Sequence, residues 1–395
     1  MLPVARQAFV NALETTGNAS SLHATGRRSR KLIEESREQI AAVLGAKSSE
    51  VVFTSGGTEA NNLALKGVFW ASVEANPARA RIITSAIEHH AVLDPLAWLT
   101  EYARAEVDYL DVDSLGRVSA AQLRNALAIA PEKTALVSVM WANNEVGTVQ
   151  PINDLAAVAH EFGVFMHSDA VQALGQLPLD FQASGLDLMT ISGHKAGGPH
   201  GVGALIVSDR VGITALTHGG GQERGLRSGT PDAPAIAAMA AAVAHWQTHQ
   251  RAHAKHLREL RDYLVQRVLA EIPAARLNGI DTRDPNYQID ARLPANAHFS
   301  FTGCEGDALL MLLDAAGVEC STGSACSAGM PEPSHVLLRM GLPDEVARGS
   351  LRFSLGWNST KADVDKLLLA LPEAVARASK AQAQAQAQAQ ARAHT

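Results

Sequence analysis

Two charged residues that follow apolar runs carry the main chemical signal of this chain. Lys195 closes the string SGHK (192–195), directly after an apolar run at 186–191. Asp169 stands earlier in the chain, directly after a second apolar run at 163–168. Short apolar runs that end in polar residues are typical of buried strands. We therefore predict that an amine and a carboxylate lie at the ends of two strands joined by one crossover.

This pair suits the coenzyme pyridoxal 5′-phosphate (PLP). An amine in a partly dry pocket loses its proton more easily and becomes a nucleophile that forms a Schiff base. A carboxylate keeps the pyridine nitrogen protonated, so that the ring acts as an electron sink. A lone lysine is more often a solvated surface group, so the prediction depends on both residues. We expect a buried amine and a buried carboxylate on one ring.

The string SGGTE (55–59) follows a predicted strand at 51–54 and precedes a predicted helix. Free amides at a helix N-terminus bind anions, and glycines let an anion approach closely. Gly57 and Thr58 are therefore candidate phosphate ligands. An ordinary tight turn capped by Thr58 is the alternative, and the neighbouring Lys–Asp pair favours the phosphate.

Three more polar side chains that follow predicted strands are candidates to contact the ring. His89, in the string EHH (88–90), can stack on a pyridine ring or carry a proton near neutral pH. The chain has 15 histidines, so a structural role is the alternative. Asn144 and Gln172 carry amides that can donate to the phenolate oxygen of PLP. Turn formation is the alternative for the paired asparagines at 143–144.

Two segments carry groups suited to anions. The Gly-rich, basic string 219–231 looks like a mobile loop, and its Thr230 can bind a phosphate, including one across a subunit interface. Arg352 lies on a predicted alternating strand, and a bidentate guanidinium suits a substrate carboxylate. A surface salt bridge is the alternative for Arg352.

The chain contains three cysteines, and none pairs with another at zinc-binding spacing. Scarce, unpaired cysteines are typical of a reducing compartment, and we predict no metal site. Cys326 lies in a small, polar string (320–330), where a thiol on a mobile loop can move between a buried site and the outside. An exposed cysteine without a role is the alternative. We interpret Cys304 and Cys320 as structural.

Composition excludes several classes of function. The chain has 395 residues, is 47% hydrophobic and 19% charged, and carries a formal net charge of −6. These values are typical of a globular protein and give no reason to expect nucleic-acid binding. No apolar run is long enough for a membrane span, and residues 1–13 do not resemble a secretory signal. We expect a cytoplasmic protein.

Strands and helices alternate along the first two thirds of the chain, which predicts an α/β fold with a mainly parallel sheet. Ligands bind at the carboxyl ends of such strands, where the candidate residues fall. An Ala-rich helical region at 233–272, with a break, leads to a smaller α/β domain with strands at 298–302, 318–320 and 351–355. For the Ala-Gln repeat from 381 onward we favour a disordered tail over a helix extension or an oligomerisation element.

Taken together, these motifs resemble the cysteine desulfurases, which are class V, fold-type I PLP enzymes. The matching strings cover about residues 18–357 in the family order: SGGTEANN, EHHAVL, NNEVGTVQ, HSDAVQALG, SGHK, GGGQERGLRSGT, STGSACS and LRFSLG. The segment 326–335 is similar to the IscS/NifS-like subgroup with an extended cysteine loop. The resemblance implies a seven-stranded large domain at 14–245, a small domain formed by 1–13 and 246–376 with the cysteine loop at about 319–332, and a tail at 377–395.

The resemblance also implies roles at the matching positions. Lys195 would bind PLP and move the Cα proton, with His89 stacked on the ring as a proton carrier, and Cys326 would take the sulfur as a persulfide. The cofactor ligands implied are Gly57, Thr58, His89, Asn144, Asp169, Gln172, Ser192, His194, Lys195 and, from the second subunit of a homodimer, Thr230. Arg352 and Asn144 would bind the carboxylate of L-cysteine.

The activity implied is removal of sulfur from L-cysteine, which gives L-alanine. The sulfur would pass to acceptor proteins for iron–sulfur cluster assembly or tRNA thiolation, including an iron–sulfur scaffold whose [2Fe-2S] cluster contacts Cys326. A selenocysteine lyase or related aminotransferase, and a non-catalytic sulfur-transfer scaffold, are the alternatives. Members of this family usually carry a short strand and a Thr-Thr segment before the position of Pro3, so we expect the true start to lie upstream.

Overall fold

The computed structural model describes residues 1–323 and 332–393, and these form two compact units. The large unit comprises residues 1–111, 118–142 and 150–251, and the small unit comprises residues 112–117, 143–149 and those from 252 onward. Residues 1–13, which we expected in the small domain, lie in the large unit. Leu2 is buried there, and its N–H donates to the carbonyl of Gly197 at 2.7 Å.

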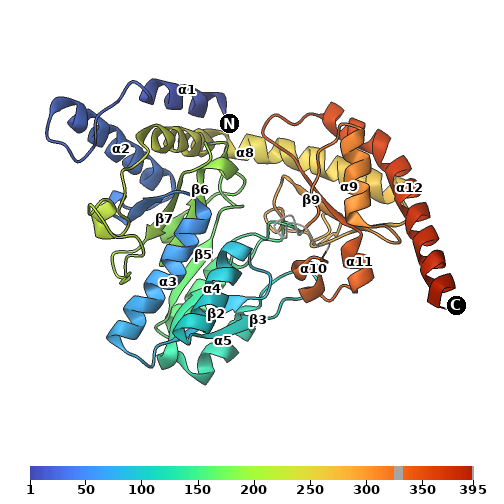
Figure 1. The fold of residues 1–395 in the computed structure, drawn as a ribbon, viewed down its shortest axis with the longest axis horizontal. Coiled ribbons are helices and arrows are strands. Elements are labelled where there is room, and N and C mark those ends of the chain that lie inside the picture. Colours follow the sequence, from blue (N-terminus) through green and yellow to red (C-terminus); the bar gives the residue numbers. More distant parts are fainter. Residues whose placement is uncertain (324–331, 394–395) are drawn as a thin grey trace. The chain divides into compact units, whose positions relative to one another are not determined.

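Within the described part of the large unit, seven strands form one mainly parallel sheet, which confirms the predicted fold class (Figure 1). The strand order is β1-β7-β6-β5-β4-β2-β3, and β7 runs antiparallel to both of its neighbours. Most of these strands are buried along their whole length, as expected for a sheet covered on both faces. The strands are β1 (Val51–Thr54), β2 (Arg81–Ser85), β3 (Glu106–Leu110), β4 (Thr134–Ser138), β5 (Phe165–Asp169), β6 (Leu188–Ser192) and β7 (Gly203–Val207).

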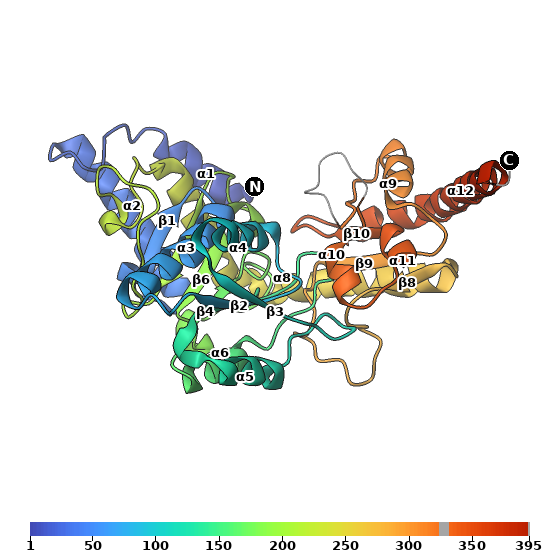
Figure 2. The same ribbon diagram turned by 60° about the horizontal axis from the view of Figure 1, so that its bottom comes forward.

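Helices cover both faces of this sheet, with α3 and α4 on one face and α5 and α6 on the other (Figure 2). Leu63 and Phe69 of α3 and Leu96 of α4 pack on Leu136 and Leu188 of the strands, and all five side chains are almost fully buried. Burial of each such side chain stabilises the fold by about 1.5–3 kcal/mol. The helices are α1 (Pro3–Ala12), α2 (Ala24–Val43), α3 (Gly57–Ala75), α4 (His90–Ala103), α5 (Ala120–Ile129), α6 (Ile152–Glu161) and the short α7 (Phe181–Ser184).

Helix α8 (Ala233–Glu271) begins in the large unit and ends in the small unit. We predicted a break in this region, and that prediction is wrong, because α8 is one helix of 39 residues. Beyond Pro234 in its first turn, α8 contains neither glycine nor proline and is rich in alanine, the best helix former. No helix of the described ranges 1–323 and 332–393 has both the length and the apolar character needed to cross a membrane.

The small unit is built on an antiparallel sheet of order β10-β9-β8. Phe299, Phe301 and Phe353 of this sheet pack against α9 and α12 in one apolar core. The prediction of a strand at 318–320 is wrong, because the N–H of Val318 donates to the carbonyl of Leu313 at the end of α9. The elements are β8 (Ala275–Leu277), β9 (Asn296–Phe301), β10 (Ser350–Ser354), α9 (Gly306–Ala315), α10 (His335–Arg339), α11 (Asp344–Arg348) and α12 (Lys361–Ala393).

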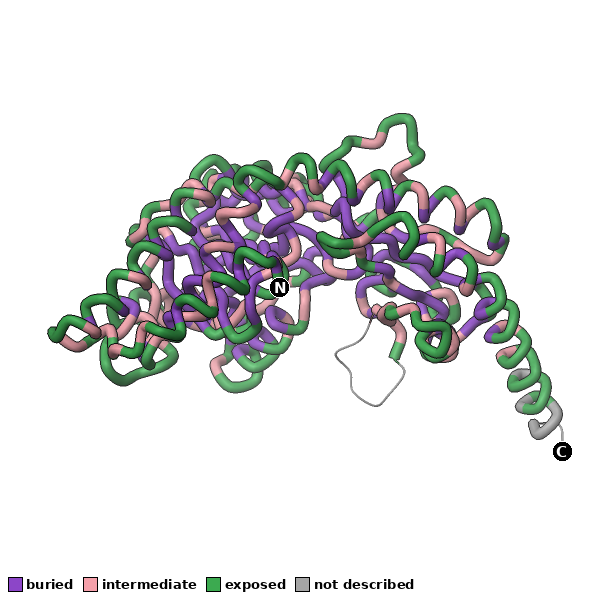
Figure 3. Tube along the Cα trace, turned by 90° about the horizontal axis from the view of Figure 1, so that it is seen from above, coloured by how far each residue is buried: buried purple, intermediate pink, exposed green. Residues whose placement is uncertain are grey.

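The Ala-Gln repeat extends α12 as far as Ala393, so the disordered tail that we favoured is wrong. Alanine and glutamine are both good helix formers, and the preceding turns of α12 are anchored by buried Leu371 and Ala378. Most strands of the two units are buried, whereas residues 380–385 of α12 are mostly exposed (Figure 3).

Candidate active site

Asp169 is the last residue of β5, and the residue is only 7% exposed. The N–H of Val171 donates to Oδ1 at 2.9 Å, and the Asn61 amide donates to Oδ2 at 2.6 Å. Burial raises the pKa of Asp169, while these two hydrogen bonds and the nearby charges of His89 and Lys195 oppose the shift. A desolvated carboxylate in this position is suited to pairing with one more cation, such as a protonated ring nitrogen.

Lys195 lies in a 3₁₀ turn, η3 (Gly193–Ala196), that directly follows β6. We expected a buried amine, and that expectation is wrong, because Lys195 is exposed in this structure. Gly193 and Ala196 of the same turn are buried, whereas His194 and Lys195 are exposed. The Lys195 charge still lowers the pKa of Asp169, His89 and His194, so the amine lies within electrostatic reach of all three side chains.

His89 is the N-cap of α4, at the carboxyl end of β2, and its ring is half-buried. Its Nδ1 accepts the backbone N–H of Ala91 at 3.0 Å. Burial lowers the pKa of His89, and the charge of Asp169 opposes this shift. The imidazole is therefore neutral at pH 7, and because Nδ1 is an acceptor, the proton sits on Nε2.

The N-terminus of α3 provides free backbone donors beside the end of β6. No described side chain caps this helix, and its N-cap is Gly56, with a φ of 153° that favours glycine. A Cβ on Gly57 would lie 2.8 Å from Val171 Cγ2 and 3.5 Å from Ser192 Cβ, so only glycine permits this close packing. Ser192 Oγ is hydrogen-bonded to Nδ1 of His194 at 2.9 Å. Thr58 lies exposed in the same first turn.

Two ion pairs tie the loop 219–231 to this region of the large unit. Arg227 binds Glu59 in the first turn of α3 at 2.7 Å. Glu223 binds Arg37 through two hydrogen bonds of 2.7 and 2.8 Å, and both side chains are buried. Glu223 and Arg224 have positive φ values of 48° and 58°, a strained conformation that these contacts hold in place. Thr230 of this loop is exposed.

In the small unit, the structure brings Arg352 and Asn144 together. The Nη1 of Arg352, on β10, donates to the Asn144 carbonyl at 2.8 Å, and both residues are half-buried. This contact fixes the direction of the guanidinium. Gln172 lies in the large unit, half-buried after β5, and its carbonyl accepts from Gln176 at 3.1 Å.

The thiol of greatest interest, Cys326, lies outside the described residues. Cys304 is buried and its Sγ lies 3.7 Å from the carbonyl of Val375. Burial raises the pKa of the Cys304 thiol, and burial together with the charge of Asp314 raises the pKa of Cys320 to about 11. Both thiols stay protonated at neutral pH, which is the property of structural cysteines.

Sequence reasoning missed Asn61, which holds the Asp169 carboxylate. Asn61 is fully buried in α3, and its Oδ1 has no hydrogen-bond partner among the described residues. A signal was present, because Asn61 shares the helix face of the apolar Leu65 and Val68. A polar residue on the apolar face of a helix indicates a candidate functional residue.

Comparison with known proteins agrees with this geometry. The model of the family described as aminotransferase class-V matches residues 5–367. The chain belongs to the class-V aminotransferase family. This family implies PLP chemistry, and the desolvated carboxylate of Asp169 together with the uncapped start of α3 fits that group.

Curated members of the family that resemble this chain are cysteine desulfurases. The IscS-like cysteine desulfurase of Mycobacterium tuberculosis is 57% identical over 381 residues, which cover 96% of this chain and 95% of that protein. The cysteine desulfurase IscS of Dictyoglomus turgidum is 44% identical, with 92% and 89% covered.

Solved structures of this family have the same fold. A NifS-like protein superposes with a TM-score of 0.84 at 34% identity, covering 94% of this chain and 95% of that one. The NifS-like protein from Rickettsia africae gives a TM-score of 0.82 at 32% identity, covering 95% and 96%.

Proposed function

We propose that the protein is a cysteine desulfurase that removes sulfur from L-cysteine and releases L-alanine. The observation that carries this proposal is the buried Asp169 carboxylate, held by Asn61 and Val171 within electrostatic reach of Lys195. Membership of a family whose similar curated members are cysteine desulfurases supports the choice of substrate.

The residues assigned to the coenzyme would bind and activate it. PLP would supply an electron sink once its ring nitrogen is protonated. Asp169 would pair with the protonated ring nitrogen, Lys195 would bind the coenzyme and move the proton at Cα of L-cysteine, and neutral His89 would stack on the ring and donate from Nε2. The residues that would hold the phosphate are Gly57, Thr58, Ser192, His194 and the partner subunit's Thr230, while Asn144 and Gln172 would contact the phenolate side.

Arg352 and Asn144 bind the substrate carboxylate. A guanidinium offers two parallel donors to a carboxylate, and the Asn144 carbonyl already orients the Arg352 fork. The negative charge of L-cysteine would thus meet a cation whose direction is fixed.

Cys326 accepts the sulfur. Its thiolate donates an electron pair to Sγ of L-cysteine, a new S–S bond forms, and the Cβ–Sγ electron pair stays with the Cβ fragment. That fragment takes up a proton and leaves as L-alanine, while Cys326 keeps a persulfide. We propose that a cytoplasmic homodimer passes this sulfur to acceptor proteins of iron–sulfur cluster assembly, including a scaffold whose [2Fe-2S] cluster contacts Cys326, or of tRNA thiolation.

The test measures alanine and sulfide together after incubation with L-cysteine and a reductant. We expect equal amounts of both from the native protein and neither from Cys326→Ala, which should keep the coenzyme absorption band. Cys320→Ala is the matched control, and its activity should be unchanged because the Cys320 thiol stays protonated at neutral pH.

Each other result contradicts part of the proposal. Unchanged turnover in Cys326→Ala rejects the persulfide and points to a selenocysteine lyase or aminotransferase. Absence of alanine from the native protein rejects the desulfurase. An absorption band and turnover that both survive Lys195→Ala remove the assigned role of that amine.

A further inference from the structure

We propose that Trp246 is a positioning residue for Lys195. By holding the turn that carries this amine, Trp246 sets how fast Lys195 attaches to the coenzyme rather than how tightly the coenzyme binds. The inference rests on the proposed function, because it takes Lys195 as the residue that binds the coenzyme. All the residues that carry it lie in the described part of the large unit.

The turn η3 places Lys195 on a short stretch of backbone between two strands. It spans four residues after β6 and ends at a glycine in the left-handed conformation. The N–H of Gly193, its first residue, donates at 3.0 Å to the carbonyl of Val202, directly before β7. This bond holds the start of the turn to the sheet. The end of the turn, at Ala196, is held by a contact from a distant helix.

That contact is a hydrogen bond from α8. The indole N–H of Trp246 donates to the carbonyl of Ala196 at 2.7 Å, across a separation of 50 residues. Trp246 is 8% exposed and Ala196 is 2% exposed, so water competes little for either group. Without the indole N–H, a buried carbonyl would lose its donor, and the backbone would shift to find another. Because Ala196 directly follows Lys195, such a shift moves the amine.

The indole of Trp246 is itself held in place. A Cβ on Gly175 would lie 2.9 Å from Nε1 and 3.1 Å from Cδ1 of the indole, so the ring edge lies directly against this glycine, whose φ is 81°. Gly175 belongs to the segment that follows Asp169. In the same segment, the carbonyl of Gln176 accepts the amide of Gln250, also on α8, at 2.7 Å. The indole N–H therefore points at the turn from a fixed position.

Helix α8 thus joins the two groups that are proposed to act on the coenzyme. It is bonded to the segment after Asp169 and also to the turn of Lys195. Met239 lies two helical turns before Trp246, on the same face of α8, and its Cγ would lie 3.3 Å from a Cβ on Gly193. The placement of the amine relative to the carboxylate therefore depends on α8. Misplacement of a reacting group by about 1 Å costs up to about 10²-fold in rate.

The experiment separates attachment of the coenzyme from its binding. Full-length protein freed of coenzyme is mixed with PLP and reduced with borohydride at set times, and mass spectrometry counts the fraction of Lys195 that carries the coenzyme. Trp246→Phe keeps a buried ring but has no donor, so we expect attachment to be about 10- to 10²-fold slower. In the PLP-loaded variant, kcat for alanine release should fall by a similar factor.

A second ligand reports binding alone. Pyridoxine 5′-phosphate has an alcohol in place of the aldehyde of PLP, so it occupies the same site without reacting with an amine. Its affinity for Trp246→Phe should stay within about threefold of the native value, because the phosphate donors at the N-terminus of α3 are untouched. A general distortion of the site would lower this affinity as well.

Two further variants distinguish the hydrogen bond from packing. Trp246→His loses most of the ring volume, but its Nε2 can donate from the ring position that the indole N–H occupies. At about pH 8, where imidazole is neutral, Trp246→His should attach the coenzyme faster than Trp246→Phe, whereas a packing role predicts the reverse order. Replacement of Trp246 by β-(3-benzothienyl)alanine keeps the shape of the indole with sulfur in place of the N–H, so it decides the question if Trp246→Phe does not fold.

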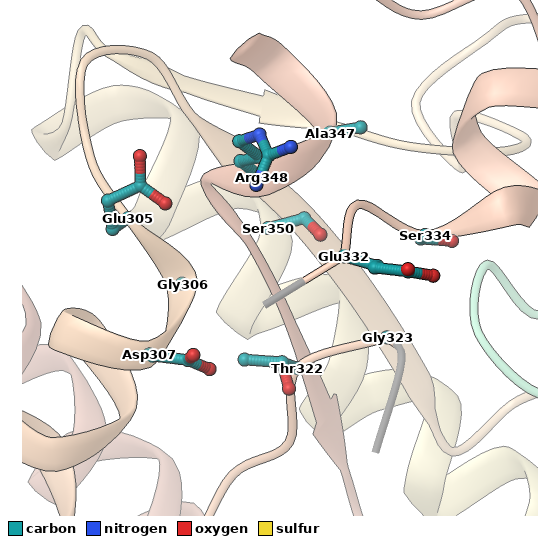
Figure 4. A pocket seen from close by; sticks show the side chains of 10 residues that line it. All are labelled: Glu305, Gly306, Asp307, Thr322, Gly323, Glu332, Ser334, Ala347, Arg348 and Ser350. Carbon is teal, nitrogen blue, oxygen red and sulfur yellow. The ribbon is translucent and has the colours of Figure 1, made fainter. Parts of the chain in front are cut away.

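Two controls should attach the coenzyme within about twofold of the native rate. Trp70→Phe makes the same substitution at a half-buried tryptophan of α3, whose ring packs on Phe69 with 5.1 Å between centroids. Glu305→Gln removes a charge in the small unit, where Figure 4 shows Glu305 on the wall of a small cavity of about 30 Å³.

Two results overturn the inference. One is an unchanged attachment rate in both Trp246→Phe and the benzothienyl variant. The other is a rate loss that Trp246→His does not relieve, or that comes with an equal loss of affinity for pyridoxine 5′-phosphate. A failure of the proposed function looks different, because the native protein itself would then carry no coenzyme on Lys195 or release no alanine from L-cysteine.

Discussion

The large unit and the small unit hold their functional groups by different means. In the large unit, Asp169 ends a buried parallel strand and His89 begins a helix directly after one. The backbone hydrogen bonds of the sheet therefore determine where these two side chains lie. In the small unit, the Arg352 guanidinium and the Ser334 hydroxyl are bonded to Asn144 and Glu145 of one turn. Side-chain hydrogen bonds of Asn143 and Asn296 hold this turn.

This difference predicts what substitutions do in each unit. A conservative change at a strand end alters the chemistry of a group that stays in place, because the ladder of backbone hydrogen bonds is untouched. A change in the turn 143–146 alters the placement of groups whose chemistry is intact, because side-chain hydrogen bonds hold this turn.

The largest effect is expected for Asp169→Asn in the large unit. The amide keeps the bond from Val171, and Asn61 can rotate so that its unpaired Oδ1 accepts from the new amide. The variant should therefore fold, while the loss of the buried charge lowers alanine formation by about 10²- to 10³-fold. Steady-state kinetics with thermal melting measures both.

Asn62→Ala is the control for this change. Asn62 lies one residue from Asn61 on α3, and its amide donates to the carbonyl of Thr58 at 2.9 Å. Its turnover should stay within about twofold of the native value. A fully active Asp169→Asn protein would show that the carboxylate is not needed for the chemistry.

A medium effect is expected for Arg352→Lys in the small unit. A lysine cannot donate to Asn144 and bind a carboxylate through a planar fork at once. The KM for L-cysteine should rise by about 10- to 10²-fold with a smaller change in kcat, because uniform substrate binding is lost. Arg348→Lys, whose partner is the exposed Asp344, should leave KM unchanged. A loss confined to kcat would contradict the assignment.

The smallest effect on turnover is expected for Glu88, which is fully buried beside the large-unit site and whose change acts on stability. Its Oε1 accepts from the Ser85 hydroxyl at 2.6 Å and the Met140 N–H at 2.8 Å, but burial outweighs these bonds and raises the pKa of Glu88 from 4.5 to about 8. The folded protein thus keeps a proton that the unfolded chain releases above pH 4.5. Its stabilising contribution is complete below pH 4.5 and is lost as the pH rises to about 8.

Denaturant unfolding of native protein and Glu88→Gln at several pH values tests this prediction. The difference in unfolding free energy between the two should change with pH by up to about 1.4 kcal/mol per unit between pH 4.5 and 8. Groups that behave alike in both proteins cancel in the difference. A difference that does not vary with pH would mean that Glu88 is ionised in the folded state.

Periodicity and polar strand ends predicted most of the large sheet. The buried runs at 186–191 and 163–168 became β6 and β5 with small shifts, because a strand covered on both faces must be apolar along its length. The predicted strand at 318–320 failed, because a short apolar run after a helix is equally compatible with the helix end. The sequence did not predict that Lys195 is exposed or that residues 1–13 belong to the large unit. Both features depend on which distant parts of the chain pack nearby.

The sequence by itself determined the α/β architecture, the order of the strands along the chain, and the residue types at the strand ends, because these follow from local patterns of apolar and polar side chains. Only the tertiary structure decided which groups touch. Asn61 meets Asp169 across a separation of 108 residues, and Ser334 meets Glu145 across 189. Contacts of such range depend on how the elements pack, and no local pattern records them.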